Sequence, residues 1–170
     1  MEFDFPRSVR IDDLYTRDTT FKVIVDKFAQ YKKDSDPKEF ATPTRHMQNE
    51  YIGILPELFG RDRFFKNPPH ARKEDLIHLH IWREPYNWID PEDGDYLVQW
   101  ECKSDTYLVY SYFKHKNKHV FYLIAFLDRN AHKETKDLPN NTANPLVLEW
   151  LREAKSYRES YQSVEQNSVT

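Results

Sequence analysis

The segment at residues 76–83 reads Leu-Ile-His-Leu-His-Ile-Trp-Arg, and the other elements are interpreted around it. Apolar and polar residues alternate along it, which predicts a half-buried β-strand. A period of two puts His78 and His80 together on one face of this strand and the apolar side chains on the other. The apolar set is Ile77, Leu79 and Ile81. The histidines are either polar-face residues without a role or the start of a proton-transfer or metal site, because imidazoles titrate near neutral pH.

The length of 170 residues predicts one domain that is large enough for a real core. We expect residues 1–162 to form this domain and residues 163–170 to be a disordered tail. The single cysteine, Cys102, excludes an internal disulfide and a cysteine-based zinc site. No apolar run approaches the length of a membrane span, so we expect a cytoplasmic protein with no membrane association.

The charge is spread unevenly over a chain whose formal net charge is −3. Residues 61–83 carry six Lys or Arg against three Asp or Glu, and residues 103–136 carry seven against three. Residues 84–101, between them, carry six acidic residues and no basic one. The overall balance argues against indiscriminate nucleic-acid binding, but it leaves room for a local basic face.

The order of the expected elements predicts an α+β domain, with two N-terminal helices packed on a small antiparallel sheet and a C-terminal helix. Asn144 and Pro145 open the last helix as an N-cap followed by proline at the first helical position. Residues 58–62 are expected to form a turn. The other helices are expected at residues 21–33 and 44–54, and the other strands at residues 8–11, 96–100, 106–113 and 120–127.

Several short segments, in this order and spacing, resemble the YafO-type toxins of bacterial type II toxin–antitoxin systems. Each is weak alone, and together they are fairly specific over roughly residues 21 to 138. The chain departs from the pattern in a longer N-terminus, in residues 35–48, which look inserted, and in a larger acidic stretch at residues 84–101. The segments that carry the resemblance are residues 28–34, 55–62, 77–80, 108–110, 123–127 and 132–133.

The resemblance implies a RelE/ParE-like fold and a translation-dependent mRNA interferase, which is an endoribonuclease that acts on mRNA at the ribosome. It also implies a cognate antitoxin, with which the toxin would form a hetero-oligomer. We expect cleavage without a metal ion or other cofactor, since one cysteine and no compact carboxylate cluster leave little to hold an ion.

RNA cleavage without a metal needs a base for the 2′-hydroxyl proton, an acid for the leaving oxygen and cations for the phosphorane charge. His78 and His80 match the paired histidines of the family, and we expect His80 to be the base or acid with His78 assisting. His132 would supply the second imidazole if the strand before it neighbours the histidine strand. His132 could equally be a loop histidine.

We expect phosphate contacts from cations near these histidines, and base stacking from one tyrosine. Arg61 could instead pair with Asp62 and fix a turn, and Tyr110 could instead be a core aromatic. The cations at residues 114–118 are either a solvated hairpin tip or a grip on ribosomal RNA. The expected RNA-binding residues are Arg61, Arg63, Tyr110, Arg129 and Lys133.

Two other functions remain open from the sequence. His-x-His on a strand is a familiar metal-ligand spacing, which Asp128, His132 or Glu101 could complete in a metal-dependent hydrolase or oxygenase. The protein could also be a toxin that acts by binding its target without catalysis. Response to a chelator separates the first from a metal-free ribonuclease, and toxicity after both histidines are replaced would favour the second.

Overall fold

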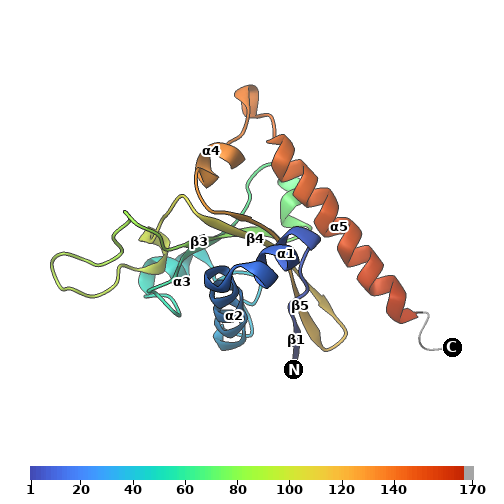
Figure 1. Cartoon of the computed structure of the whole chain (residues 1–170), viewed down its shortest axis with the longest axis horizontal. Helices are drawn as coiled ribbons and strands as arrows, with labels where there is room; N and C mark the ends of the chain where they lie inside the picture. The colour runs from blue at the N-terminus through green and yellow to red at the C-terminus, as the bar shows by residue number, and fades with distance from the viewer. Residues whose placement is uncertain (167–170) are drawn as a thin grey trace.

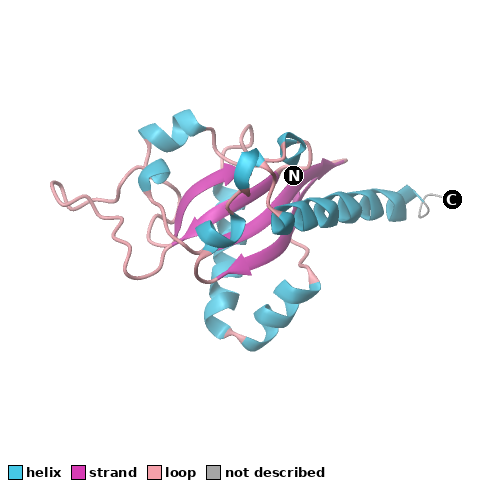
Figure 2. Ribbon diagram, turned by 90° about the horizontal axis from the view of Figure 1, so that it is seen from above, coloured by secondary structure: helices cyan, strands magenta, loops and turns pink. Residues whose placement is uncertain are grey.

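The computed structural model describes residues 1–166, which form one five-stranded sheet with helices on both faces (Figures 1 and 2). The strand order is β1-β5-β4-β3-β2, in which β1 runs parallel to β5 and the other neighbours are antiparallel. The histidine strand β3 therefore lies between β2 and β4. The strands are β1 (Glu2–Asp4), β2 (Phe59–Phe64), β3 (Leu76–Ile81), β4 (Tyr107–His115) and β5 (Lys118–Leu127).

Two apolar cores form, one on each face of the sheet. The first core joins α1 (Val9–Arg17) and α2 (Thr19–Asp34) to one face, and the second joins α5 (Pro145–Gln166) to the other. The remaining α-helices are short: α3 (Arg45–Glu50) and α4 (Ala131–Thr135). This arrangement confirms the α+β class. None of the helices described within residues 1–166 combines the length and the apolar character needed to cross a membrane.

The N-terminal region differs from the prediction. The first strand lies at Glu2–Asp4, while Ser8 begins a helix, because its hydroxyl accepts a hydrogen bond from the Ile11 amide as an N-cap. The Ser8 hydroxyl also donates to the Ile124 carbonyl on β5, which ties the start of α1 to the sheet. The expected strand at residues 8–11 is therefore wrong, and the helix expected from residue 21 begins two residues earlier, at Thr19.

Residues 59–64 form the edge strand β2, where we expected a turn. Leu55, at a φ of 55°, makes the turn just before it. Gly60 then lets another segment approach closely, since a Cβ atom there would lie 2.1 Å from the Cys102 carbonyl oxygen. The segment expected as a strand at residues 96–100 is mostly loop and ends in a short 3₁₀ helix, η2 (Gln99–Glu101), whose Gln99 donates to the Gly60 carbonyl.

A buried ion pair fastens α2 to β2. Lys32 Nζ lies 2.8 Å from Asp62 Oδ2, and both side chains are fully buried. Tyr31 and Tyr110 donate hydrogen bonds to the same carboxylate, at 3.0 and 2.8 Å. Because a buried charge that loses its partner costs about 3–5 kcal/mol, this cluster specifies how α2, β2 and β4 fit together.

The C-terminal helix begins as predicted, with the Asn144 side chain accepting a hydrogen bond from the Leu146 amide. It continues to Gln166, so the first residues of the expected tail are helical. The rest of that tail, residues 167–170, lies outside the described residues.

Candidate functional site

His78 and His80 lie on the α5 side of β3, and aromatic rings pack against both. Their ring centroids are 5.5 Å apart, and Tyr107 of β4 lies 4.6 Å from each. Phe65 lies 4.5 Å from His78. The alternation of the strand predicted this shared face correctly. It did not predict the burial, because all six residues of β3 are buried and the histidines are only 7% and 5% exposed.

Burial lowers the pKa of both imidazoles, because a low-dielectric surrounding disfavours the imidazolium ion. The pKa of His78 falls well below its ordinary value, and nearby His80, Arg63 and Arg61 lower it further. The pKa of His80 falls to about 3, again mainly through burial, and its hydrogen bond to Ser104 opposes the fall. At neutral pH both rings are therefore neutral.

The backbone of Ser104 orients the His80 ring. Nδ1 of His80 lies 2.9 Å from both the amide nitrogen and the carbonyl oxygen of this buried serine. The ring can accept from the N–H group as one tautomer or donate to the carbonyl as the other. In either case Nδ1 is engaged, and Nε2 is the nitrogen left for a reacting group. Nδ1 of His78, by contrast, is buried without a hydrogen-bond partner.

Arginines border the histidines on the neighbouring edge strand. Arg63 is the β2 residue directly opposite His78 in the register of the sheet. Arg61 donates from Nε to the Trp100 carbonyl at 2.6 Å, and its Cζ lies 4.1 Å from the centre of the Trp100 ring. Arg45 of α3 also lies over this ring, at 4.9 Å. Arg61 does not pair with Asp62, because that carboxylate lies in the core with Lys32.

His132 lies on the short helix α4. Asp105, just before β4, anchors the start of α4 by accepting a hydrogen bond from the His132 amide at 2.7 Å. Our condition that β5 neighbours β3 is not met, since β4 lies between them. His132 is exposed, and it is the last of the groups that lower the pKa of His78, after burial, His80 and the two arginines.

The other expected RNA-binding residues lie in different surroundings. Arg129 and Lys133 are exposed beside His132, at the end of β5 and on α4. Tyr110 is fully buried on the opposite face of the sheet, where its hydroxyl donates to Asp62 and its ring packs against Phe28. This position leaves no open face on which a base could stack, so Tyr110 is a core aromatic.

The acidic residues that could complete a metal site with the β3 histidines lie near basic side chains instead. Asp128 pairs with Arg83, and the Glu101 carboxylate lies 3.9 Å from Lys103. Among the described residues, no three His, Cys, Asp or Glu side chains form a group that could hold a metal ion.

The sequence analysis did not identify Ser104, Tyr107, Trp100 or Arg45 as part of this region. The position of Tyr107 opposite His80 follows from the β3–β4 register, which the alternation of one strand does not specify. Arg45 belongs to residues 35–48, which we expected to be an insertion, and Trp100 belongs to the acidic stretch at residues 84–101. No local signal indicated that they would meet Arg61.

Together, these elements define a small α+β protein with neutral histidines, an exposed histidine and arginines on one side of its sheet. A family model described as Toxin YafO, type II toxin–antitoxin system, matches residues 29–159. The match covers more than half of the chain, which therefore belongs to this toxin family, and the family implies a cognate antitoxin as partner. No curated protein and no solved structure matched the chain in the comparisons.

Proposed function

We propose that this toxin is an endoribonuclease that cleaves mRNA on the ribosome, in the cytoplasm and without a metal ion, and so stops translation. We also propose that its fold is similar to that of the RelE and ParE toxins. The observation that supports the proposed activity most is the pair of neighbouring histidines on β3, His78 and His80, with Arg63 directly opposite His78 on β2. Groups of these types are what metal-free phosphodiester cleavage requires.

In the proposed reaction a base removes the proton from a ribose 2′-hydroxyl, and the oxygen attacks the adjacent phosphorus. The P–O5′ bond breaks, an acid protonates the leaving 5′-oxygen, and a 2′,3′-cyclic phosphate remains. His80 is the proposed base, because its ring is neutral and, in the tautomer whose Nδ1–H donates to the Ser104 carbonyl, Nε2 is unprotonated and can accept a proton. A bound phosphodiester anion would raise the pKa of this imidazole and so make it a better proton acceptor.

The exposed His132 is the proposed acid, and His78 is a positioning residue that packs beside His80. Arg61 and Arg63 would stabilise the phosphorane charge, since guanidinium groups match phosphate oxygens in pairs. Arg129 and Lys133, exposed next to His132, would hold the RNA backbone on the far side.

The test is His80→Asn, which retains an amide group near the position of Nδ1 for Ser104 but has no atom in place of Nε2. We expect cleavage of a translated message, measured by primer extension, to fall about 10²–10⁴-fold, as for loss of a positioned base. His80→Ala is a poorer variant, because it leaves a cavity against Tyr107 and an unpaired Ser104 amide.

The matched control is His119→Asn. His119 is equally buried and bonds to the Tyr112 hydroxyl, but it packs against Phe40 in the other half of the molecule. It should lose a similar amount of stability and keep full cleavage. Full cleavage by a folded His80→Asn protein would refute the assignment of the base.

A toxin that acts by binding alone is the second candidate, and the low exposure of both β3 histidines favours it. It predicts growth arrest by His80→Asn without any RNA cleavage. A metal-dependent hydrolase is tested separately by elemental analysis of the purified protein and by the response of cleavage to a chelator.

A further inference from the structure

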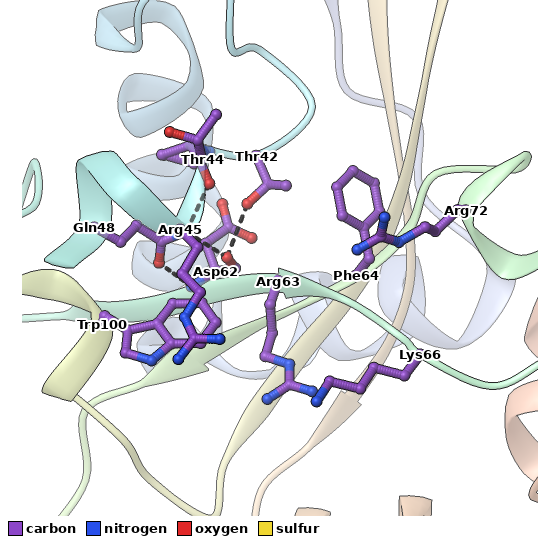
Figure 3. Close-up of a pocket in the computed structure, with 11 residues that line it drawn as sticks. Thr42, Thr44, Arg45, Gln48, Asp62, Arg63, Phe64, Lys66, Arg72 and Trp100 are labelled. Carbon is purple, nitrogen blue, oxygen red and sulfur yellow. Dashed lines mark hydrogen bonds between the residues drawn. The ribbon is translucent and has the colours of Figure 1, made fainter. Parts of the chain in front are cut away.

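A basic pocket of about 350 Å³ lies at the outer edge of β2, next to the histidine region (Figure 3). Its volume is within the range of pockets that bind small ligands. One wall comes from the loop that contains Thr42 and Thr44, and another comes from Trp100. These belong to residues 35–48 and 84–101, the two segments in which the sequence analysis expects this chain to depart from the family pattern.

The pocket carries positive charge that no acidic side chain neutralises. Four cationic residues line it, and within the described part of the chain none of them forms an ion pair with a carboxylate. Asp62 also lines it, but its carboxylate is held in the core by Lys32 and Tyr110. The cations are Arg45, Arg63, Lys66 and Arg72. Such a pocket suits an anion with several acceptor oxygens, such as a phosphate.

Aromatic rings hold two of these cations in place. Arg45 lies over the Trp100 ring, and Arg72 lies 5.7 Å from the centre of the Phe64 ring. In Figure 3 the Arg63 and Lys66 side chains extend toward one another. Bases in single-stranded RNA stack on aromatic rings and on guanidinium planes. The lining therefore offers both a phosphate site and a stacking platform.

Arg63 connects the pocket to the proposed reaction site, because it lines the pocket and stands opposite His78 in the sheet. We propose that the pocket binds a nucleotide of the single-stranded RNA adjacent to the nucleotide at the cleaved bond. Lys66 and Arg72 hold its phosphate, and the base stacks on the Arg45–Trp100 pair. This subsite rests on the proposed function, and it adds the part of the RNA chain that the histidine region does not hold.

The test compares the wild type with a Lys66→Gln, Arg72→Gln double variant. Both residues are exposed, so the variant should melt like the parent. The probe is a fluorescein-labelled single-stranded RNA of about ten nucleotides with methylated 2′-hydroxyls, which cannot be cleaved. Binding is measured by anisotropy over a series of salt concentrations. The Arg152→Gln, Lys155→Gln variant, which removes two exposed cations on α5, is the matched control for loss of charge.

We expect the double variant to bind the RNA at least about tenfold more weakly, and the control to bind like the wild type. The slope of log K against log salt should become shallower by about 0.7, since the two cations hold one phosphate and each neutralised phosphate on a single strand contributes about 0.7. A Trp100→Leu variant should also weaken binding, because it removes the stacking ring and the surface that holds Arg45 in place.

Unchanged RNA affinity and slope in the double variant would overturn the pocket assignment. So would a double variant that loses only the antitoxin, which would assign the pocket to an acidic protein segment. Cleavage of a translated message by the wild type is measured in parallel and reports on the proposed function separately. If the wild type cleaves and the double variant binds normally, only the subsite is refuted; if the wild type neither binds nor cleaves RNA, both are refuted.

Discussion

Burial changes what the two histidines on β3 can do. On an exposed strand they would be partly protonated near neutral pH, whereas here the pKa of His80 is lowered to about 3 and that of His78 is lowered well below its ordinary value. A neutral imidazole can accept a proton but is a poor donor of one. This is why we assign the base to β3 and the acid to the exposed His132 of α4.

The lowered pKa values predict that the folded protein is sensitive to acid. The unfolded chain binds a proton at His80 below about pH 6.5, while the folded protein does so only near pH 3. The stabilising contribution is thus fully present above about pH 6.5 and is lost as the pH falls toward 3. For His80 alone we expect a loss of about 2 kcal/mol between pH 7 and pH 5, measured by urea unfolding at the two pH values.

His80→Asn serves as the internal comparison, because asparagine does not titrate. Its free energy of unfolding should fall less between pH 7 and pH 5 than that of the parent, by the same 2 kcal/mol or so. Equal losses in the two proteins would mean that His80 keeps a more ordinary pKa and is less buried than in this structure.

At the scale of elements, Asn144 determines how α4 sits relative to α5. Its side-chain oxygen caps α5 at the Leu146 amide, and its amide group donates to the carbonyls of Glu134 and Lys136 at 3.0 and 2.8 Å. The second pair of bonds holds the end of α4, which carries His132. One buried side chain thus couples the start of a long helix to the proposed acid.

Two substitutions separate these functions of Asn144. Asn144→Asp keeps the cap oxygen but loses both donors, so α4 should loosen and cleavage should fall by up to about 10²-fold while α5 stays capped. Asn144→Ala loses the cap as well and should cost about 1–2 kcal/mol more in the free energy of unfolding. Thermal melts and the primer-extension assay give the two readouts.

Asp18→Ala is the control for a cap that lies away from the site. Asp18 accepts from the Phe21 amide at 3.0 Å as the N-cap of α2. Its loss should cost about 1 kcal/mol in stability and leave cleavage unchanged. If Asp18→Ala reduces cleavage as much as Asn144→Asp does, then general destabilisation explains both effects and the link through α4 is refuted.

At the scale of the whole molecule, the charge distribution fits a protein that is acidic overall but basic in places. The formal net charge is −3, yet cations gather at the β2 edge and around Trp100. We expect the cognate antitoxin to bring an acidic or amphipathic segment to this basic side, where the proposed RNA site also lies. Binding of the antitoxin would then exclude RNA by occupying the same cations.

Expression of the chain without its antitoxin should arrest bacterial growth because translation stops. After induction, incorporation of labelled methionine should fall before incorporation of labelled thymidine, because the proposed target is mRNA. His80→Asn should be tolerated, and co-expression of the antitoxin should restore growth. Earlier loss of thymidine incorporation would instead indicate a gyrase poison of the ParE type.

Some of the site could be predicted from the sequence, because it depends on short-range periodicity. Alternation placed His78 and His80 on one face, and the cap at Asn144 marked the start of α5. Local patterns misjudged β2, where antiparallel pairing with β3 makes an edge strand out of an expected turn. The residues next to Tyr110 in the sequence do not indicate whether this tyrosine is buried in the core or exposed.

The sequence by itself determined the α+β class, the toxin family and the shared face of the histidines, since these follow from residue order and from the two-residue period of a strand. Only the tertiary structure decided that the rings of Phe65 and Tyr107 pack against those histidines and that burial keeps them neutral. It alone brought Arg45, Arg61 and Trp100 together from separate segments. The reason is physical: burial and charge clustering depend on contacts between residues far apart in the chain, and a local pattern carries no information about which of them will meet.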